Sequence, residues 1–361
     1  MYRQMIDLNN NCIIDGKAYS LSEVEKMGLD NFSFSAHKTP HKCFFKYYPN
    51  TTKYVKEEKK YHNYSFEALV NNTIFLQDAK NFDDCFDCAV DLDWNKFLTD
   101  RVKKYCDYFN VGIESENIND IIYALSLKLY KHSTIEKCMK ATADLQDEVQ
   151  KMQVEIFIRH VFNKVLAGEE WMPAIFSAIQ KEFEEFEKIL SRFKISCFST
   201  SPYLNRMWSS AYADNNKGFC IEYEIDTSKK RGIELYNNIF PVIYSQARND
   251  FFPLVKNFDK SPSQEDLWQI YYNGLLRKSA HWIDQCEWRL ILYDRQIAQN
   301  PISFFKIKKV YLGNKMPCKT RKKIVSFCRR NNIEYVGLIR KPNSFDLVDC
   351  VGDCFTCPKM L

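Results

Sequence analysis

Apolar residues follow a helical period between about residues 94 and 193, whereas the segments on both sides indicate short strands. Within residues 173–193 the apolar side chains recur every three or four positions, and Pro173 suits the first turn of a helix. Gly168 predicts the end of the preceding helix. The chain is therefore predicted to be an α+β protein, in which a large helical insertion interrupts a mixed or antiparallel β core.

The predicted organisation has four parts. Residues 1–42 are polar and turn-rich and are predicted to be an N-terminal extension, and residues 346–361 form a Cys-rich C-terminal tail. Residues 43–93 and 195–345 make one discontinuous α+β core domain, and residues 94–194 are the helical insertion. Strands are expected at 43–48, 73–77, 195–199, 218–225, 240–244, 287–293, 304–312 and 335–339, with helices at 66–71 and 320–330.

Composition narrows the class of protein. The 361 residues include 27 Phe and 21 Tyr, so a large core can form without disulfides or metal ions. The formal net charge of +5 is too small for a dedicated nucleic-acid binder. No run approaches the roughly 18 apolar residues of a membrane span, and the N-terminus shows no apolar signal segment. We therefore expect a cytoplasmic protein with no membrane contact, whose isolated cysteines are reduced and buried: Cys106, Cys138, Cys220, Cys286 and Cys328.

One candidate site lies in the segment 285–293. On a strand, alternate residues share a face, so Gln285, Glu287 and Arg289 would lie together while Cys286 and Trp288 face the core. A carboxylate between an amide and a guanidinium can hold a sugar hydroxyl and stabilise positive charge. The same pattern also fits any half-exposed strand.

Two further segments carry candidate ligand contacts. The hydroxyls of Ser199 and Ser201 follow a strand, where they would donate to a ligand or cap a turn. Trp208 and Tyr212 are four residues apart on a predicted short helix ending at Asn215 or Asn216. This pair would sandwich an aromatic ligand or pack in the core.

Metal sites remain alternatives. Cys85-x-x-Cys88 and Cys354-x-x-Cys357 together could form a four-sulfur zinc site, with Cys350 as a spare ligand. A set of carboxylates could instead hold magnesium for phosphodiester hydrolysis, unless these are scattered surface acids: Asp83, Asp84, Asp87, Glu222 and Glu224.

Several segments, in chain order, resemble the bacterial domain-of-unknown-function family 2971. The resemblance covers most of the chain outside the extension and the helical block, and it implies no established chemistry. It rests on residues 44–49, 66–76 and 82–87, Cys197-Phe-Ser199, Met207-Trp208, residues 212–223, Glu287-Trp-Arg289 and Val310-Tyr-Leu-Gly313.

A more distant likeness is to mono-ADP-ribosyltransferases. Ser199-Thr-Ser201 and Gln285-x-Glu287 match the second and third motifs of that family, whereas Tyr48 occupies the position expected for the arginine of the first. The resemblance implies that Glu287 holds the ribose of NAD and stabilises an oxocarbenium-like cation while Gln285 orients the acceptor. The remaining implied NAD contacts are Lys46, Tyr48, Ser199, Ser201, Trp208, Tyr212 and Arg289.

The function expected from this likeness is an ADP-ribosyltransferase-like enzyme. It would cleave NAD and transfer ADP-ribose to a macromolecular acceptor, protein or nucleic acid, as a toxin or anti-phage effector. On this hypothesis Glu287→Ala abolishes NAD turnover and leaves the fold intact. The alternatives are a non-enzymatic, zinc-stapled module that binds a protein or nucleic acid, and a magnesium-dependent nuclease. Zinc content, NAD binding and magnesium-dependent cleavage distinguish the three.

Overall fold

The computed structural model describes residues 7–82, 84–89, 92–141, 143, 145–248, 251–255 and 263–351. The chain divides into two compact units. Unit 1 comprises residues 1–87, 192–247 and 276–361, and unit 2 comprises residues 88–191 and 248–275. The protein contains helices and a largely antiparallel sheet in separate segments of the chain, so the predicted α+β class is confirmed.

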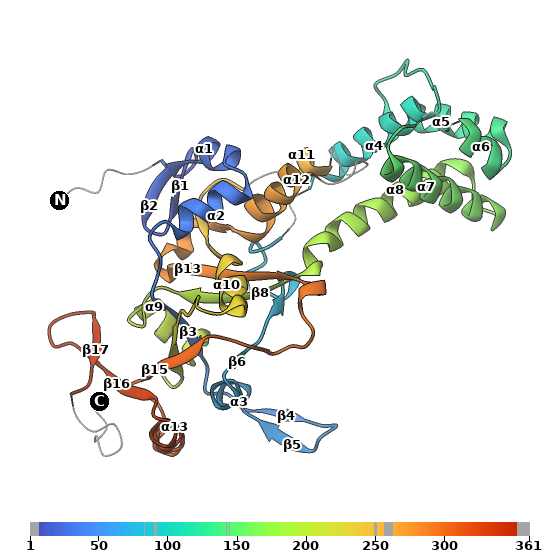
Figure 1. Ribbon diagram of the computed structural model, residues 1–361. Coiled ribbons are helices and arrows are strands. Elements are labelled where there is room, and N and C mark those ends of the chain that lie inside the picture. The colour runs from blue at the N-terminus through green and yellow to red at the C-terminus, as the bar shows by residue number, and fades with distance from the viewer. Residues whose placement is uncertain are drawn as a thin grey trace. The chain divides into compact units, whose positions relative to one another are not determined.

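Unit 1 is organised around a curled, mixed sheet (Figure 1). Among the described residues its strand order is β10-β13-β8-β3-β9-β15-β16-β17, and β7 pairs with β8 off this path. The pairings are antiparallel except for β15 with β16. The bounds are β3 Cys43–Tyr48, β7 Gln77–Asp78, β8 Phe193–Ser199, β9 Phe219–Glu224, β10 Ile239–Pro241, β13 Glu287–Tyr293, β15 Lys306–Leu312, β16 Glu334–Arg340 and β17 Leu347–Asp349.

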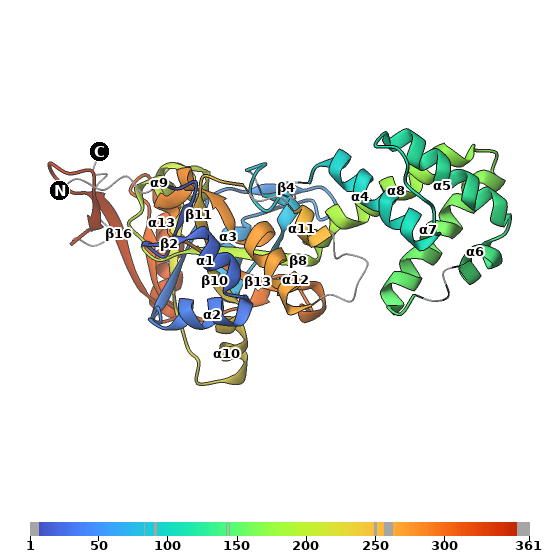
Figure 2. The same ribbon diagram turned by 90° about the horizontal axis from the view of Figure 1, so that it is seen from above.

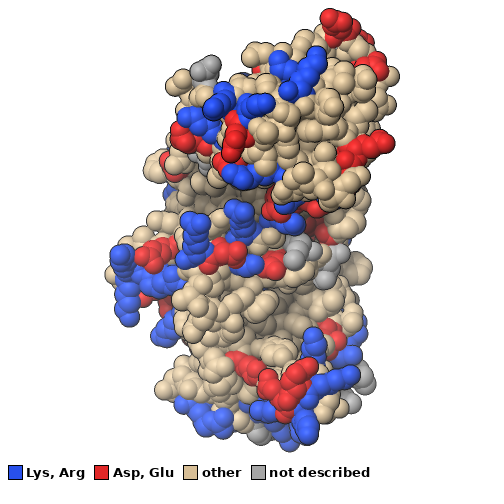
Figure 3. Space-filling model, turned by 90° about the vertical axis from the view of Figure 1, so that its right-hand side faces the viewer, with Lys and Arg blue, Asp and Glu red and all other residues tan. Residues whose placement is uncertain are grey.

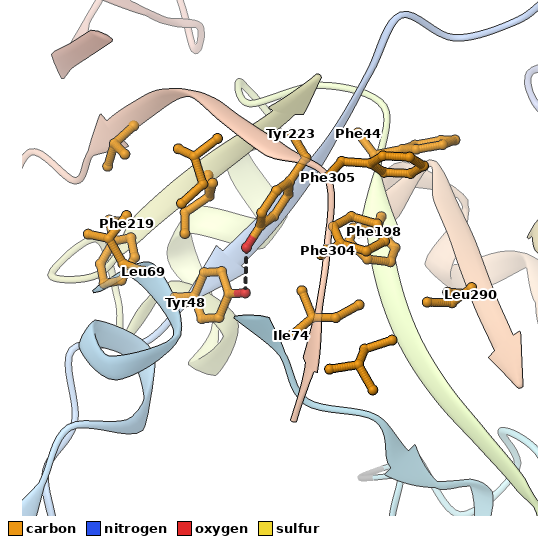
Figure 4. Packing of buried hydrophobic residues seen from close by; sticks show 14 of the residues in the cluster. Phe44, Tyr48, Leu69, Ile74, Phe198, Phe219, Tyr223, Leu290, Phe304 and Phe305 are labelled. Carbon is orange, nitrogen blue, oxygen red and sulfur yellow. Dashed lines mark hydrogen bonds between the residues drawn. The ribbon is translucent and has the colours of Figure 1, made fainter. Parts of the chain in front are cut away.

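The larger core of unit 1 covers one face of this sheet. Phe198 stacks on Phe304 with ring centroids 4.8 Å apart, and both lie in the aromatic cluster of Figure 4. A bulge at Lys308 shifts the register of β15, so that Ile307 and Val310 both face this core. Helices that contribute apolar side chains to it include α3 Tyr64–Asn71, α10 Lys230–Asn237 and α13 Cys318–Arg330.

The first 42 residues differ from the predicted polar extension. β1 Asn11–Ile14 pairs with β11 Ile243–Ser245, in a second sheet of order β12-β11-β1-β2. Cys12 and Ile14 are buried there. The apolar alternation of β1 is too short to predict a strand from the sequence, but the strand is buried because it pairs with β11. The other elements are β2 Lys17–Ser20, α1 Leu21–Lys26, α2 Leu29–His37 and β12 Arg277–Ser279.

Short elements connect the sheets of unit 1. Two small pairs are β4 Lys53–Val55 with β5 Lys60–His62, and β6 Thr73–Ile74 with β14 Ile302–Ser303. Asn63 caps α3 by accepting a hydrogen bond from the backbone of Phe66 at 2.8 Å. The remaining turns are α9 Asn205–Ser209 and the 3₁₀ helices η1 Ala79–Asn81, η3 Ala211–Ala213, η5 Ala280–Gln285 and η6 Asp294–Gln296.

Unit 2 is helical (Figure 2). Tyr105 of α4 stacks on Phe157 of α7 at 3.7 Å between ring centroids, and α7 ends before Gly168, whose φ of 96° only glycine adopts easily. The sequence assigned residues 248–275 to the β core, but they belong to this unit. Its elements are α4 Trp94–Tyr108, α5 Ile118–His132, α6 Ile135–Ala141, α7 Glu148–Leu166, α8 Trp171–Glu187, η2 Lys188–Arg192 (which ends one residue into unit 1), α11 Phe252–Val255, α12 Gln264–Gln269 and the π-helix η4 Ile270–Leu275.

The described surface carries both signs of charge. Basic and acidic side chains are interleaved on the face shown in Figure 3, as the small net charge predicts. None of the helices in the described ranges has the length and apolar character needed to cross a membrane.

Candidate functional site

Three strands of unit 1 converge at one residue, Ser199. Ser199 of β8 lies opposite Glu287 of β13 in the antiparallel register, and it also pairs with Phe45 of β3. Among the described residues this is the single pairing between β3 and β8, so the two strands separate beyond it. A cavity of about 200 Å³ is lined by residues of both strands and by residues near the start of β13.

The cavity brings together five of the residues predicted from the sequence. Lys46, Ser199, Tyr212, Gln285 and Glu287 all line it. Most of the remaining wall is apolar and mainly aromatic: Phe45, Tyr47, Phe75, Phe82, Ile195, Phe198 and Met207. Gln77, Ser196, Cys197 and Lys278 complete the lining. A small aromatic-walled cavity with a few polar groups has the character of a ligand site.

Lys46 spans the gap between the separating strands. Its Nζ donates to the Ser196 hydroxyl at 2.9 Å and to the Cys197 carbonyl oxygen at 3.0 Å. The ammonium also lies 5.2 Å from the centre of the Phe198 ring. Burial lowers the pKa of Lys46, although Cys197 and Glu287 oppose that shift.

Gln285 reaches the cavity from a different element than predicted. It ends η5, and β13 begins only at Glu287. Between them Cys286 adopts a left-handed conformation with φ of 46°, and it is exposed rather than buried in the core as predicted. The predicted common face of Gln285 and Glu287 is therefore produced by a tight turn.

Glu287 belongs to a closed ring of four buried charged side chains. Its Oε1 accepts from Arg289 Nε at 2.7 Å and its Oε2 from Lys278 Nζ at 2.6 Å. Asp87 accepts from Arg289 Nη2 at 2.7 and 2.8 Å and pairs with Lys278 at 3.0 Å. All four side chains are at most 5 % exposed. The ring is neutral, and its buried ion pairs satisfy one another.

The ring fixes the ionisation of two members. Burial raises the pKa of Glu287, but Arg289 and Lys278 outweigh it and hold this pKa well below its ordinary value. Burial lowers the pKa of Lys278, but the carboxylates of Glu287 and Asp87 outweigh this effect and hold the pKa above its ordinary value. Glu287 is thus a carboxylate and Lys278 an ammonium over the physiological range.

The sequence interpretation missed Lys278 and misplaced Asp87. Lys278 lies on β12, in a short segment without periodicity, so no local signal marks it. Asp87 is one of the proposed magnesium ligands, but it binds Arg289 and Lys278 instead. Arg289 is fully buried behind Glu287 and does not line the cavity. Because Glu287 closes the ring, its removal is also expected to weaken the fold, contrary to the sequence expectation.

Tyr48 lies in the core rather than in the cavity. It is buried, and its ring stacks on Phe219 with centroids 5.4 Å apart. Its hydroxyl meets that of Tyr223 at 3.0 Å, the dashed line of Figure 4. Although Tyr48 shares a strand face with Lys46, the aromatic cluster takes up its side chain, so the structure does not place it among the cavity residues.

Trp208 and Ser201 also have structural roles. Trp208 is buried against Tyr47 and donates Nε1 to the Pro202 carbonyl oxygen at 2.7 Å. Ser201 accepts from the backbone N–H of Tyr203 at 3.2 Å, which is the turn-capping alternative. The two residues do not line the cavity.

The predicted helix containing Trp208 and Tyr212 is wrong in extent. α9 ends at Ser209, and Tyr212 belongs to the separate 3₁₀ helix η3. Three consecutive left-handed residues, Asp214 to Asn216, then turn the chain toward β9. The break leaves Tyr212 39 % exposed at the cavity instead of stacked beside Trp208.

The proposed metal ligands do not converge within the described residues. Glu222 accepts from the Tyr311 hydroxyl at 2.7 Å, and Asp84 from Trp282 Nε1 at 2.8 Å. In the described ranges no group of three or more His, Cys, Asp or Glu is arranged to hold a metal. Asp83, Cys354 and Cys357 lie outside those ranges, while Cys85 is exposed and Cys88 is buried.

A comparison with protein families gives one match. The model of a family described as "Protein of unknown function (DUF2971)" matches residues 207–290. This segment contains Lys278, Glu287 and Arg289 of the charge ring and three further cavity residues, Met207, Tyr212 and Gln285. The match supports the resemblance to this family found in the sequence. Searches of curated proteins and of solved structures each give no match.

Proposed function

We propose that the cavity binds the nicotinamide–ribose end of NAD and that the chain is an ADP-ribosyltransferase-like enzyme. One observation carries the proposal: Ser199 and Glu287, from the two matching motifs, lie opposite each other and line one cavity with Lys46 and Gln285. Ser199 and Glu287 are far apart in the sequence and meet only because β8 pairs with β13. Their presence in one cavity is therefore evidence for a shared site.

The chemistry assigned to each residue follows from its position. Glu287 supplies a permanent carboxylate at the cavity wall, where it would hold a ribose hydroxyl and stabilise the cation left when nicotinamide departs. Tyr212 offers an aromatic face to the nicotinamide ring, and Gln285 offers an amide to the reacting groups. The cavity volume of about 200 Å³ suits this end of NAD only, so the adenosine half would lie outside it.

The decisive experiment measures nicotinamide release from NAD by the full chain. Glu287→Gln keeps the shape of the side chain and removes its charge, and we expect turnover to fall at least about a hundredfold. Glu224→Gln is the matched control, since Glu224 is an exposed residue at the end of β9. Thermal unfolding of both variants fixes an assay temperature at which each remains folded. Unchanged turnover in Glu287→Gln would contradict the proposal.

One feature favours a second candidate, a module that binds its ligand without turnover. Both oxygens of Glu287 are already hydrogen-bonded to cations, and the ring around it is neutral. Such a carboxylate stabilises a new positive charge less than a free one would. NAD binding to the wild-type chain without any nicotinamide release would select this candidate.

A further inference from the structure

The cavity contains two hydrogen-bond donors whose capacity the protein does not use. The Nε2 atom of Gln285 is buried, the residue is 2 % exposed, and no described residue forms a hydrogen bond with that nitrogen. The neighbouring Tyr212 side chain interacts with the Gln285 amide, which opposes the rise that burial causes in the Tyr212 pKa, but this contact does not have the geometry of a hydrogen bond to Nε2. A buried N–H without an acceptor costs free energy, so a ligand that supplies one gains affinity.

Lys46 is the second such donor. An ammonium carries three N–H groups, and two of them are used by the Ser196 hydroxyl and the Cys197 carbonyl oxygen. Both partners are uncharged, and Lys46 forms no ion pair within the described part of the chain. Lys46 is half-buried, and a cation withdrawn from water without a carboxylate partner is costly unless an anion binds beside it.

The charges around the cavity indicate the sign and the magnitude of the charge that a ligand should carry. Lys46, Lys278 and Arg289 are cations, and Asp87 and Glu287 are carboxylates, so one positive charge is left over. The four members of the ring neutralise one another, which places this excess on Lys46. A monoanion would balance it, whereas a phosphoryl dianion would reverse it.

We propose that this cavity is a binding site for a small aromatic carboxylate, whose two oxygens accept from Lys46 Nζ and Gln285 Nε2. The aromatic wall formed by Phe45, Phe82 and Phe198 would enclose the ring, and the cavity volume of about 200 Å³ limits the ligand to a single ring system. This ligand goes beyond the proposed function, since the nicotinamide of NAD carries an amide there. It would exclude NAD from the cavity and so act as an inhibitor or effector.

The test uses benzoate and benzamide, which share a ring and a shape but differ in charge. Titration calorimetry of the full chain at pH 7 should show benzoate binding about tenfold to a hundredfold more tightly than benzamide. Lys46→Met should remove that preference, and Gln285→Leu should weaken benzoate binding about tenfold. Lys42→Met removes the same charge at an exposed position and should leave both affinities unchanged.

Each outcome bears on the proposal. Equal or tighter binding of benzamide, or binding of neither compound, overturns it. If Lys46→Met does not fold, the wild-type preference and Gln285→Leu decide the matter. Benzoate binding by a chain that releases no nicotinamide from NAD supports this site and contradicts only the proposed enzyme. NAD turnover that benzoate at saturation does not inhibit contradicts the shared cavity.

Discussion

Asp87 accepts two hydrogen bonds from a single nitrogen of Arg289, at 2.7 and 2.8 Å, across 202 positions of sequence. The pair closes the buried ring that holds the carboxylate of Glu287 at the cavity. Asp87 therefore joins the loop after η1 to strand β13.

Asp87→Ala should lower the free energy of unfolding by about 3–5 kcal/mol, because it leaves buried cations without one of their carboxylates. Urea denaturation followed by circular dichroism measures the change. The control is Asp349→Ala, which removes a carboxylate paired with Lys309 at 2.9 Å where Asp349 is 38 % exposed. There we expect a loss below about 1 kcal/mol. Equal losses in the two variants would show that the ring adds no stability beyond a surface pair.

Acid should destabilise the protein partly through Glu287. Its pKa in the folded state lies well below the ordinary value of 4.5, because Arg289 and Lys278 outweigh the cost of burial. The folded state then binds fewer protons than the unfolded state, so this contribution is complete above pH 4.5 and is lost as the pH falls toward the folded pKa. Glu287→Gln should be less stable at neutral pH and lose less stability on acidification. Parallel profiles of the two proteins between pH 6 and pH 3, measured by urea denaturation, would contradict this assignment.

Tyr48→Phe should affect stability and leave ligand binding unchanged. The substitution removes the hydrogen bond to Tyr223 and leaves a buried hydroxyl without that partner, at a cost of about 1–2 kcal/mol. Thermal unfolding and titration with NAD give the two readouts. A change in NAD affinity without a change in stability would restore Tyr48 to the binding site.

Gly218→Ala should destabilise the sheet where β9 meets β3. A Cβ at this position would lie 2.1 Å from the backbone oxygen of Tyr48, which cannot move without disturbing β3. We expect a loss of at least about 2 kcal/mol. Gly112→Ala is the control, because a Cβ there meets nothing within 4 Å. Similar stabilities of the two variants in urea would show that the backbone accommodates the clash.

Features that depend only on neighbouring residues could be predicted from the amino-acid sequence. The helical period of residues 173–193 predicted α8 with Pro173 in its first turn, although α8 ends at Glu187 and a 3₁₀ helix follows it. The alternation after Cys286 predicted β13 with Trp288 and Leu290 facing the core. These predictions are reliable because a helix or a strand imposes its period on consecutive side chains. The same reasoning also placed Ser199 and Glu287 at strand ends.

Which of these residues contact one another depends on how the chain folds in three dimensions. The strand order places β13 beside β8, and β12 brings Lys278 to Glu287, whereas the loop before Cys88 brings Asp87 to Arg289. No local period records a contact across 202 positions, because it depends on strand order, register and the path of intervening loops. For the same reason Tyr48, chosen correctly as a strand residue, has its side chain in the core, while Lys46 on the same face bridges two strands at the cavity.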